Sequence, residues 1–259
     1  MNFFYIPIIY TFKTRLKNLV SLFSWFIICP LLLFILLITK EQGSITLSII
    51  ICYILSFIHT YNLYEIGYII NDTETIKKES NPTLRLSDSK LSFYYKKRLS
   101  IYLERIILSL FISIILIYYY NTPLIAISYS WLLIPFYLIY NNIRNIYNLP
   151  IHFILVVLRY TSPLILTINL NPEDFFYIIL VFPLVNLIER ASEKRFNINF
   201  LIKRRNKIRN LRIFYYFIIL LIFITLDILN YNIPSYIIIA SFYMLLYRIL
   251  SPIIINKTK

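Results

Sequence analysis

SITLSIIICYILSFIHTYNLYEIGYII, residues 44–70, is a predominantly apolar run. A helix rises about 1.5 Å per residue, so about 20 apolar residues cross the hydrocarbon core of a bilayer. Comparable runs fill most of the chain, at residues 18–39, 99–119, 122–140, 149–169, 173–190, 211–229 and 232–255. The pattern predicts an all-α, polytopic membrane helix bundle with about eight transmembrane helices.

The composition excludes a soluble globular domain. Hydrophobic residues make up 59% of the chain and aromatic residues 18%, with a mean hydropathy of +0.71, and a soluble fold of this size has too little interior to bury them. Two glycines provide no Gly-rich phosphate loop, which argues against nucleotide-binding folds. Cys29 and Cys52 lack a metal or disulfide spacing, so we expect them to pack as apolar side chains. No second domain is evident, and residues 1–259 are predicted to form one transmembrane domain.

The net charge of +14 is carried by residues between the apolar runs, where Lys and Arg orient membrane proteins rather than bind nucleic acid. Eight spans place both termini on one side, together with long polar loops at residues 71–98 and 191–210. That side carries Lys13, Arg15, Lys17, Lys77, Lys78, Arg85, Lys90, Lys96, Lys97, Arg98, Arg144, the basic residues from Lys194 to Arg212, Lys257 and Lys259, whereas the other side carries only Lys40. The positive-inside rule predicts that both termini and both loops are cytoplasmic.

Two acidic clusters lie at cytoplasmic ends of predicted spans. If the second helix continues past residue 70, Asn71, Thr75 and Glu79 share one face and Asp72 borders it. At the end of the sixth span, Asn186, Glu189 and Glu193 are spaced so that they can also point one way. Four spans separate the clusters, so we expect both on the same membrane face, where they can meet.

Carboxylate and amide oxygens bind Mg²⁺, whose remaining positions are often filled by substrate phosphates. Acids for the metal and cations for phosphate together predict a diphosphate site. The simpler alternative is a pair of solvated helix ends with ordinary interfacial charge. The predicted catalytic and metal residues are Asp72, Glu79, Glu189 and Glu193; the predicted substrate-binding residues are Asn71, Lys77, Lys78, Arg85, Arg159, Arg190 and Lys194.

Several ionisable residues fall inside predicted spans. Arg159 lies about ten residues into the fifth span, roughly 15 Å deep, where it needs an anionic partner. His59 and His152 are expected to be hydrogen-bonded structural residues. Arg105, with its neighbour Glu104, and Arg248 are interpreted as snorkelling interfacial residues.

These residues resemble the UbiA-type superfamily of intramembrane prenyltransferases, whose first motif, Asn-Asp-x-x-Asp-x-x-x-Asp, ends the second helix and whose second acidic motif follows the sixth. Asn71, Asp72 and Glu79 match the first motif, and Glu189 and Glu193 resemble the second. The chain is most similar to the decaprenyl-phosphate phosphoribosyltransferase branch, through the segment Asn81-Pro82-Thr83-Leu84-Arg85 and weaker likenesses at Arg15-Leu16-Lys17-Asn18-Leu19, Val157-Leu158-Arg159, and Arg190 with Glu193.

The resemblance, which covers residues 15 to 195, implies an Mg²⁺-dependent transferase of a bacterial-type plasma membrane. It would move a phosphoribosyl group from phosphoribosyl diphosphate to a polyprenyl phosphate, a carrier for cell-surface glycan precursors. The chain departs from the family at Thr75, where an acid is expected, and at His152, and the ninth helix of the family is not apparent, so eight to nine helices are expected.

Three other functions are compatible with the sequence. A prenyl diphosphate could donate its prenyl group to an aromatic or other small lipophilic acceptor at the same site. A transporter or flippase could use Arg159 and His59 to line a path across the membrane, although the loops are polar on one side only. A non-catalytic scaffold would leave the two acidic clusters unexplained.

Overall fold

The structure is a computed structural model that describes residues 2–42, 44–79, 82–143 and 145–257, with the side chains of 206 and 252–257 left out. Asn81, Arg144 and Lys259, and the side chain of Lys257, which the sequence analysis used, lie outside this description. The described residues form helices joined by loops and turns, and they contain no strand. Six helices are long and apolar enough to cross a membrane: Leu19–Lys40, Leu47–Lys78, Asp88–Tyr120, Leu124–Asn142, Asn148–Ile165 and Ile208–Ile228. They indicate a membrane protein.

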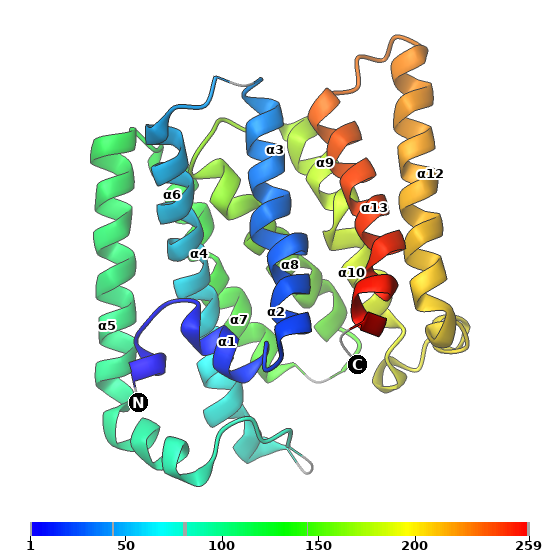
Figure 1. Ribbon diagram of the computed structural model, residues 1–259. Coiled ribbons are helices and arrows are strands. Elements are labelled where there is room, and N and C mark those ends of the chain that lie inside the picture. Colours follow the sequence, from blue (N-terminus) through cyan, green and yellow to red (C-terminus); the bar gives the residue numbers. More distant parts are fainter. Residues whose placement is uncertain (1, 43, 80–81, 144, 258–259) are drawn as a thin grey trace. The chain divides into compact units, whose positions relative to one another are not determined.

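The chain divides into two compact units, a first unit of Met1–Leu22 and Leu47–Asn169 and a second unit of Phe23–Thr46 and Leu170–Lys259. The first unit contains η1 (Asn2–Phe4), α1 (Ile9–Thr14), the start of α2 (Leu19–Phe26), α4 (Leu47–Thr73), η3 (Thr75–Lys78), α5 (Asp88–Tyr120), α6 (Leu124–Trp131), α7 (Leu133–Asn142) and α8 (Asn148–Ile165). Its central helix is α4, which contacts α1, α5, α7 and α8 (Figure 1).

The centre of the first unit is closely packed between α4 and α7. A Cβ atom added at Gly67 would lie 2.0 Å from the Tyr137 ring, so only glycine fits at this position. The Asn141 side chain donates a hydrogen bond of 3.1 Å to the Gly67 carbonyl oxygen. Small residues allow helices to approach closely in membranes. Gly67 has this role between α4 and α7.

The second unit is built around α13. It contains the end of α2, the π-helical turn η2 (Ile27–Leu31), α3 (Leu32–Lys40), α9 (Pro172–Val181), α10 (Pro183–Ala191), η4 (Lys194–Phe196), α11 (Asn199–Ile202), η5 (Arg205–Lys207), α12 (Ile208–Ile228) and α13 (Ser235–Lys257). Helix α13 contacts α3, α9 and α12. Asn171 and Asp174 form a capping box at the start of α9, with Pro172 in the first turn, as their spacing favours.

The predicted span at residues 173–190 is not one continuous helix. It consists of α9 and α10, which are separated at Phe182. Pro183 lacks an N–H and its ring clashes with the preceding turn, so an α-helix cannot continue through it undisturbed. The predicted span at 232–255 corresponds to α13, in which the segment Ser235–Ser251 is apolar.

Candidate functional site

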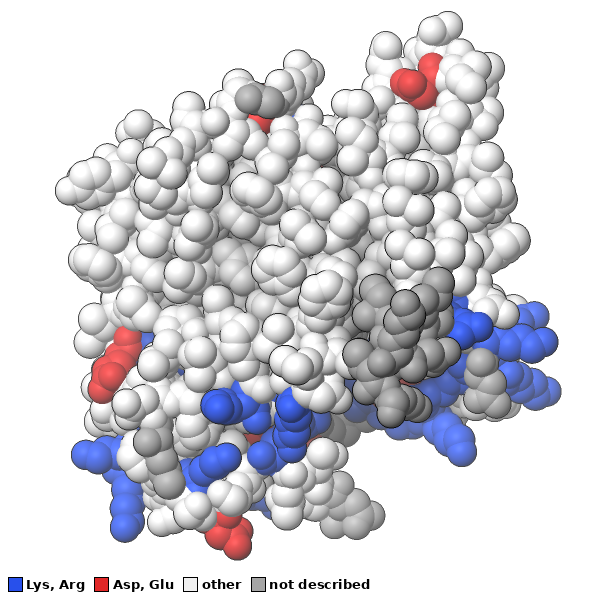
Figure 2. Space-filling model, viewed as in Figure 1, with Lys and Arg blue, Asp and Glu red and all other residues white. Residues whose placement is uncertain are grey.

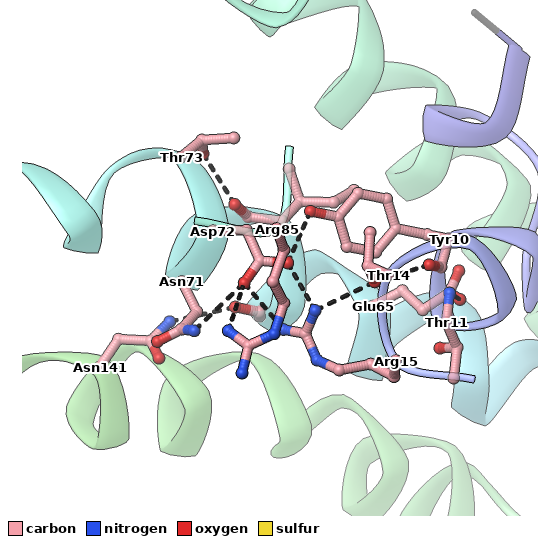
Figure 3. A network of polar contacts seen from close by, with 12 residues as sticks. Tyr10, Thr11, Thr14, Arg15, Glu65, Asn71, Asp72, Thr73, Arg85 and Asn141 are labelled. Carbon is pink, nitrogen blue, oxygen red and sulfur yellow. Dashed lines mark hydrogen bonds and ion pairs between the residues drawn. The ribbon is translucent and has the colours of Figure 1, made fainter. Parts of the chain in front are cut away.

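The Asp72 carboxylate is the centre of a polar cluster at the C-terminal end of α4 (Figure 3). The Asp72 side chain is fully buried, and both of its oxygens accept hydrogen bonds from arginines. Arg15 donates from Nη1 at 2.6 Å and from Nη2 at 2.9 Å, and Arg85 donates from Nη1 at 3.2 Å. Two guanidinium groups therefore face one carboxylate, and these three side chains together carry a net positive charge.

Two neutral side chains complete the cluster. The Tyr10 hydroxyl donates to Asp72 at 2.9 Å and the Asn71 amide donates at 3.3 Å. Burial, together with the adjacent Asp72 carboxylate, raises the pKa of Tyr10, which keeps its hydroxyl a donor. Burial opposes the charge of Arg15, but the hydrogen bonds and charge of Asp72 raise the pKa of Arg15 above its ordinary value.

Tyr10 and Arg15 are held in place by a buried ion pair. Glu65 on α4 accepts hydrogen bonds from the backbone N–H of Ile8 at 3.0 Å and of Thr11 at 2.6 Å. Arg105 on α5 donates to Glu65 at 3.0 Å and to the Phe4 carbonyl oxygen at 2.7 Å. The N-terminal segment is thus fixed to α4 and α5 by two charged side chains that are themselves fully buried.

Sequence reasoning missed Tyr10 and Glu65, and it interpreted Arg105 wrongly. Arg105 does not snorkel to the interface, because its side chain is completely buried and paired with Glu65. A buried charge is stable only when it is paired and hydrogen-bonded. The sequence did contain a signal for this pair: Glu65 and Arg105 lie in two successive apolar runs, and charged residues inside such runs usually pair with one another.

The first predicted ridge does not form as expected. Helix α4 ends at Thr73, and residues Thr75–Lys78 continue as a 3₁₀ helix, with Glu79 extended after it. Three residues per turn replace 3.6 in this segment, so fourfold spacing no longer places Asn71, Thr75 and Glu79 on one face. Asn71 and Asp72 remain together, whereas Thr75 is buried and Glu79 is half-buried.

The predicted phosphate-binding cations of this loop have different surroundings. Arg85 lies at Asp72, whereas Lys77 and Lys78 are exposed. Lys77 donates to Glu74 at 2.9 Å and lies over the Tyr95 ring. Glu74 also accepts a hydrogen bond from the Tyr94 hydroxyl. The structure therefore brings Asn71, Asp72 and Arg85 together and leaves the two lysines at the surface.

The second ridge is also altered. Asn186 and Glu189 lie on α10, but that helix ends at Ala191, and Glu193 is extended. Glu189 accepts a hydrogen bond from Arg212 of α12. Glu193 pairs with Arg190 at 2.7 Å and with Arg195 at 2.9 Å, and Lys194 is exposed at the start of η4. This ridge lies in the second unit and the first ridge in the first unit, so their meeting stays a prediction.

A predicted Mg²⁺ site can be tested against the donors present. Within the part of the chain that the structure describes, no three His, Cys, Asp or Glu side chains are grouped as metal ligands would be. Both oxygens of Asp72 accept hydrogen bonds from arginines, and each guanidinium repels a second cation. The residues around Asp72, as arranged here, do not fit Mg²⁺ and do fit an anion.

Arg159 occupies the interior of the first unit without an acidic partner among the described residues. It donates to the Tyr64 hydroxyl at 3.3 Å, its Cζ lies 4.9 Å from the centre of the Tyr64 ring, and its Nε is buried with no hydrogen-bond partner. His59, deeper along α4, is buried against Ser130 at 3.0 Å. Arg159 is thus a cation stabilised by aromatic rings, with a buried donor that a ligand could satisfy.

Comparison with family models, curated proteins and solved structures gave no match. In the first unit, Lys and Arg gather at the end of the bundle that carries the loop between α4 and α5, while the opposite end is nearly uncharged (Figure 2). In the second unit, they gather where α12 begins.

Proposed function

We propose that the protein is an integral-membrane transferase of the UbiA type that uses a donor with a diphosphate leaving group and a lipid acceptor. The supporting observation is that both Arg15 and Arg85 pair with the buried carboxylate of Asp72. A cluster with excess positive charge, partly shielded from water, attracts the diphosphate of a donor and stabilises it as it leaves.

Each member of the cluster has a separate role in this proposal. Asp72 orients the guanidinium groups, and Tyr10 and Asn71 fix Asp72. Arg85 is 30% exposed and uses only Nη1 on Asp72 within the described residues, so its other nitrogens are available to a phosphate oxygen. Lys77 and Lys78, exposed nearby in sequence, add attraction for the incoming anion.

The favoured reaction transfers phosphoribose from phosphoribosyl diphosphate to a polyprenyl phosphate. The bond between ribose C1 and the diphosphate oxygen breaks, the electron pair leaves with diphosphate, and an anionic oxygen of the lipid phosphate forms the new bond to C1. No proton has to be removed from this acceptor. Arg159 would hold the acceptor phosphate, using the donor that the protein leaves without a partner.

In this reaction Mg²⁺ would enter the site bound to the diphosphate donor. It would bind the diphosphate oxygens and neutralise part of their charge. The residues predicted to bind the metal, Asp72, Glu79, Glu189 and Glu193, are given no such role here, because the residues around Asp72 do not fit Mg²⁺.

The finer topology belongs to the same proposal. Eight spans, with the broken pair α9 and α10 counted as one, would place both termini and the loops at 71–98 and 191–210 in the cytoplasm of a bacterial-type plasma membrane. The distribution of Lys and Arg supports this orientation. A water-soluble diphosphate donor would then reach the Asp72 cluster from the cytoplasm.

A second candidate, prenyl transfer, is favoured by the aromatic rings of the first unit. Arg15 lies 4.1 Å from the centre of the Tyr68 ring, and Tyr68 contacts Tyr64 with ring centres 5.0 Å apart. Tyr137 packs edge-on against Tyr64 at 4.9 Å. Aromatic faces stabilise positive charge, and such charge develops on the allylic carbon when a prenyl group leaves its diphosphate.

The proposal is tested by measuring the thermal unfolding midpoint of the detergent-purified protein with different ligands. The ligands are phosphoribosyl diphosphate, geranylgeranyl diphosphate or none, each with and without Mg²⁺. A ligand at about 100 times its Kd stabilises the folded state by about 2.7 kcal/mol. Stabilisation by phosphoribosyl diphosphate alone supports the favoured reaction, and by the prenyl diphosphate alone the second candidate.

A variant pair identifies the site of binding. Replacing Arg85→Gln should abolish the ligand-dependent shift and the transfer of radiolabel to lipid, because the diphosphate loses its exposed cation. The matched control is Lys96→Gln, an exposed cation on α5, which should retain both. No shift with either ligand would overturn the proposal and favour a transporter. An unaffected Arg85→Gln protein would overturn the assignment of the donor to the Asp72 cluster.

A further inference from the structure

The second unit contains an apolar pocket that the proposed transferase reaction does not use. It has a volume of about 430 Å³ and lies between α10, α11 and the first half of α12. Its walls are formed mainly by Ile188, Leu211, Phe214 and Ile218. The volume is in the range of ligand-binding pockets, about 300 to 1,000 Å³.

Two arginines line this pocket. Arg204 and Arg212 both line it, and the Arg204 guanidinium lies 3.6 Å from the centre of the Phe200 ring. Arg212 is neutralised by Glu189. In the described part of the chain, Arg204 forms no ion pair. The pocket therefore combines an apolar interior with one uncompensated guanidinium at its edge.

The sequence around the pocket strengthens this charge. Residues 194–212 contain no Asp or Glu, and they contain Lys194, Arg195, Lys203, Arg204, Arg205, Lys207, Arg209 and Arg212. Figure 2 shows this end of α12 as a dense patch of Lys and Arg. Basic clusters beside a membrane-spanning helix attract anionic lipids, by about 1 kcal/mol for each Lys or Arg near the surface.

We propose that this pocket binds one anionic phospholipid of the surrounding bilayer, with an acyl chain against Leu211 and Phe214 and the phosphate at Arg204. A soluble anion would satisfy the cations but leave the apolar walls exposed to water. A zwitterionic lipid such as phosphatidylcholine would fill the walls and bring a phosphate, but its choline cation cancels that charge, so Arg204 and the surrounding basic residues would gain no net counter-charge. An anionic phospholipid satisfies both, and the bilayer supplies it at high local concentration.

The proposal is independent of the transferase reaction, because its readout is lipid retention rather than turnover. The full-length protein is equilibrated with mixed vesicles of phosphatidylglycerol and phosphatidylcholine, extracted in mild detergent and analysed by native mass spectrometry. We expect one phosphatidylglycerol molecule to remain bound in preference to phosphatidylcholine. Equal retention of both lipids, or retention of neither, would overturn the proposal.

Two variants test the two halves of the pocket. Leu211→Trp fills the apolar interior and should weaken retention of both lipids by about tenfold or more. Arg204→Gln should remove the preference for phosphatidylglycerol and leave the phosphatidylcholine signal unchanged. The matched control is Lys96→Gln with Lys97→Gln, two exposed cations on α5 of the first unit, and it should behave like the wild type.

Folding of each variant is checked by its thermal midpoint. If Leu211→Trp is unstable, Ile218→Trp fills the same pocket from another turn of α12. Undiminished lipid retention in a folded pocket-filling variant, or an unchanged lipid preference in Arg204→Gln, would contradict the assignment of the site.

Discussion

Glu65 on α4 and Arg105 on α5 form an ion pair in which both side chains are completely buried, with Oε2 and Nη2 3.0 Å apart. The pair also binds backbone groups of the N-terminal segment, at Phe4, Ile8 and Thr11. Three parts of the chain are joined at this point, and the cluster around Asp72 depends on it because Tyr10 and Arg15 belong to the attached segment.

Replacing Arg105→Leu should destabilise the protein by about 3–5 kcal/mol, because it leaves the Glu65 carboxylate buried without a partner. Thermal denaturation in detergent measures this loss. The neighbouring variant Glu104→Gln changes an exposed side chain on the same helix, and its midpoint should stay at the wild-type value. Equal midpoints for the two variants would show that the pair contributes nothing to folding.

Asp72→Asn should lower the thermal midpoint and abolish turnover. Folding should be affected as well as chemistry, because the carboxylate is fully buried and pairs with two arginines. The variant leaves Arg15 and Arg85 without a counter-charge, so inorganic diphosphate should stabilise it more than it stabilises the wild type. The measurement is the diphosphate-dependent shift of both proteins; a smaller shift in Asp72→Asn than in the wild type would contradict the anion site.

Gly67→Ala should destabilise the first unit by about 1–3 kcal/mol, because the added methyl group overlaps the Tyr137 ring. Tyr137→Ala creates space at this contact. Gly67→Ala should therefore cost less stability in the Tyr137→Ala background than in the wild-type protein. A double-mutant cycle of thermal midpoints measures this coupling. Additive effects would show that α4 and α7 do not approach as closely as described.

Arg159→Met should separate folding from function. Methionine has a similar length, and the arginine it replaces has no acidic partner in the described chain, so stability should change little or increase. Under the proposed reaction, the KM for the lipid phosphate should rise by about tenfold or more, while stabilisation by the diphosphate donor persists. Unchanged kinetics with the lipid acceptor would remove Arg159 from the site.

The helices were predicted well where a single physical property determines them. The run at 18–39 corresponds to Leu19–Lys40 and the run at 122–140 to Leu124–Asn142, because a long apolar segment satisfies its backbone hydrogen bonds internally by forming a helix. The break between α9 and α10 was not predicted, although Pro183 was a visible signal for it. Helix α5 begins at Asp88, well before the apolar run that starts at residue 99. This start was missed because hydropathy marks only the apolar part of a helix.

The candidate site was predicted only in part. Asn71, Asp72 and Arg85 were expected to act together, and they lie in one cluster. The expected face through Asn71, Thr75 and Glu79 failed, because it required an α-helix in a segment that turns as a 3₁₀ helix. Tyr10, Glu65 and Arg105 are distant from one another in sequence, and no spacing rule connects them.

The sequence by itself determined that the chain is helical and apolar enough for a membrane, and that its basic residues lie between the apolar runs, since both properties follow from composition and order along the chain. The tertiary structure decided the partners of the charges. Asp72 binds Arg15 and Arg85, and Glu65 binds Arg105. Burial makes an unpaired charge costly, so each buried carboxylate takes the cation that folding brings nearest, and the identity of that cation depends on packing rather than on distance along the chain.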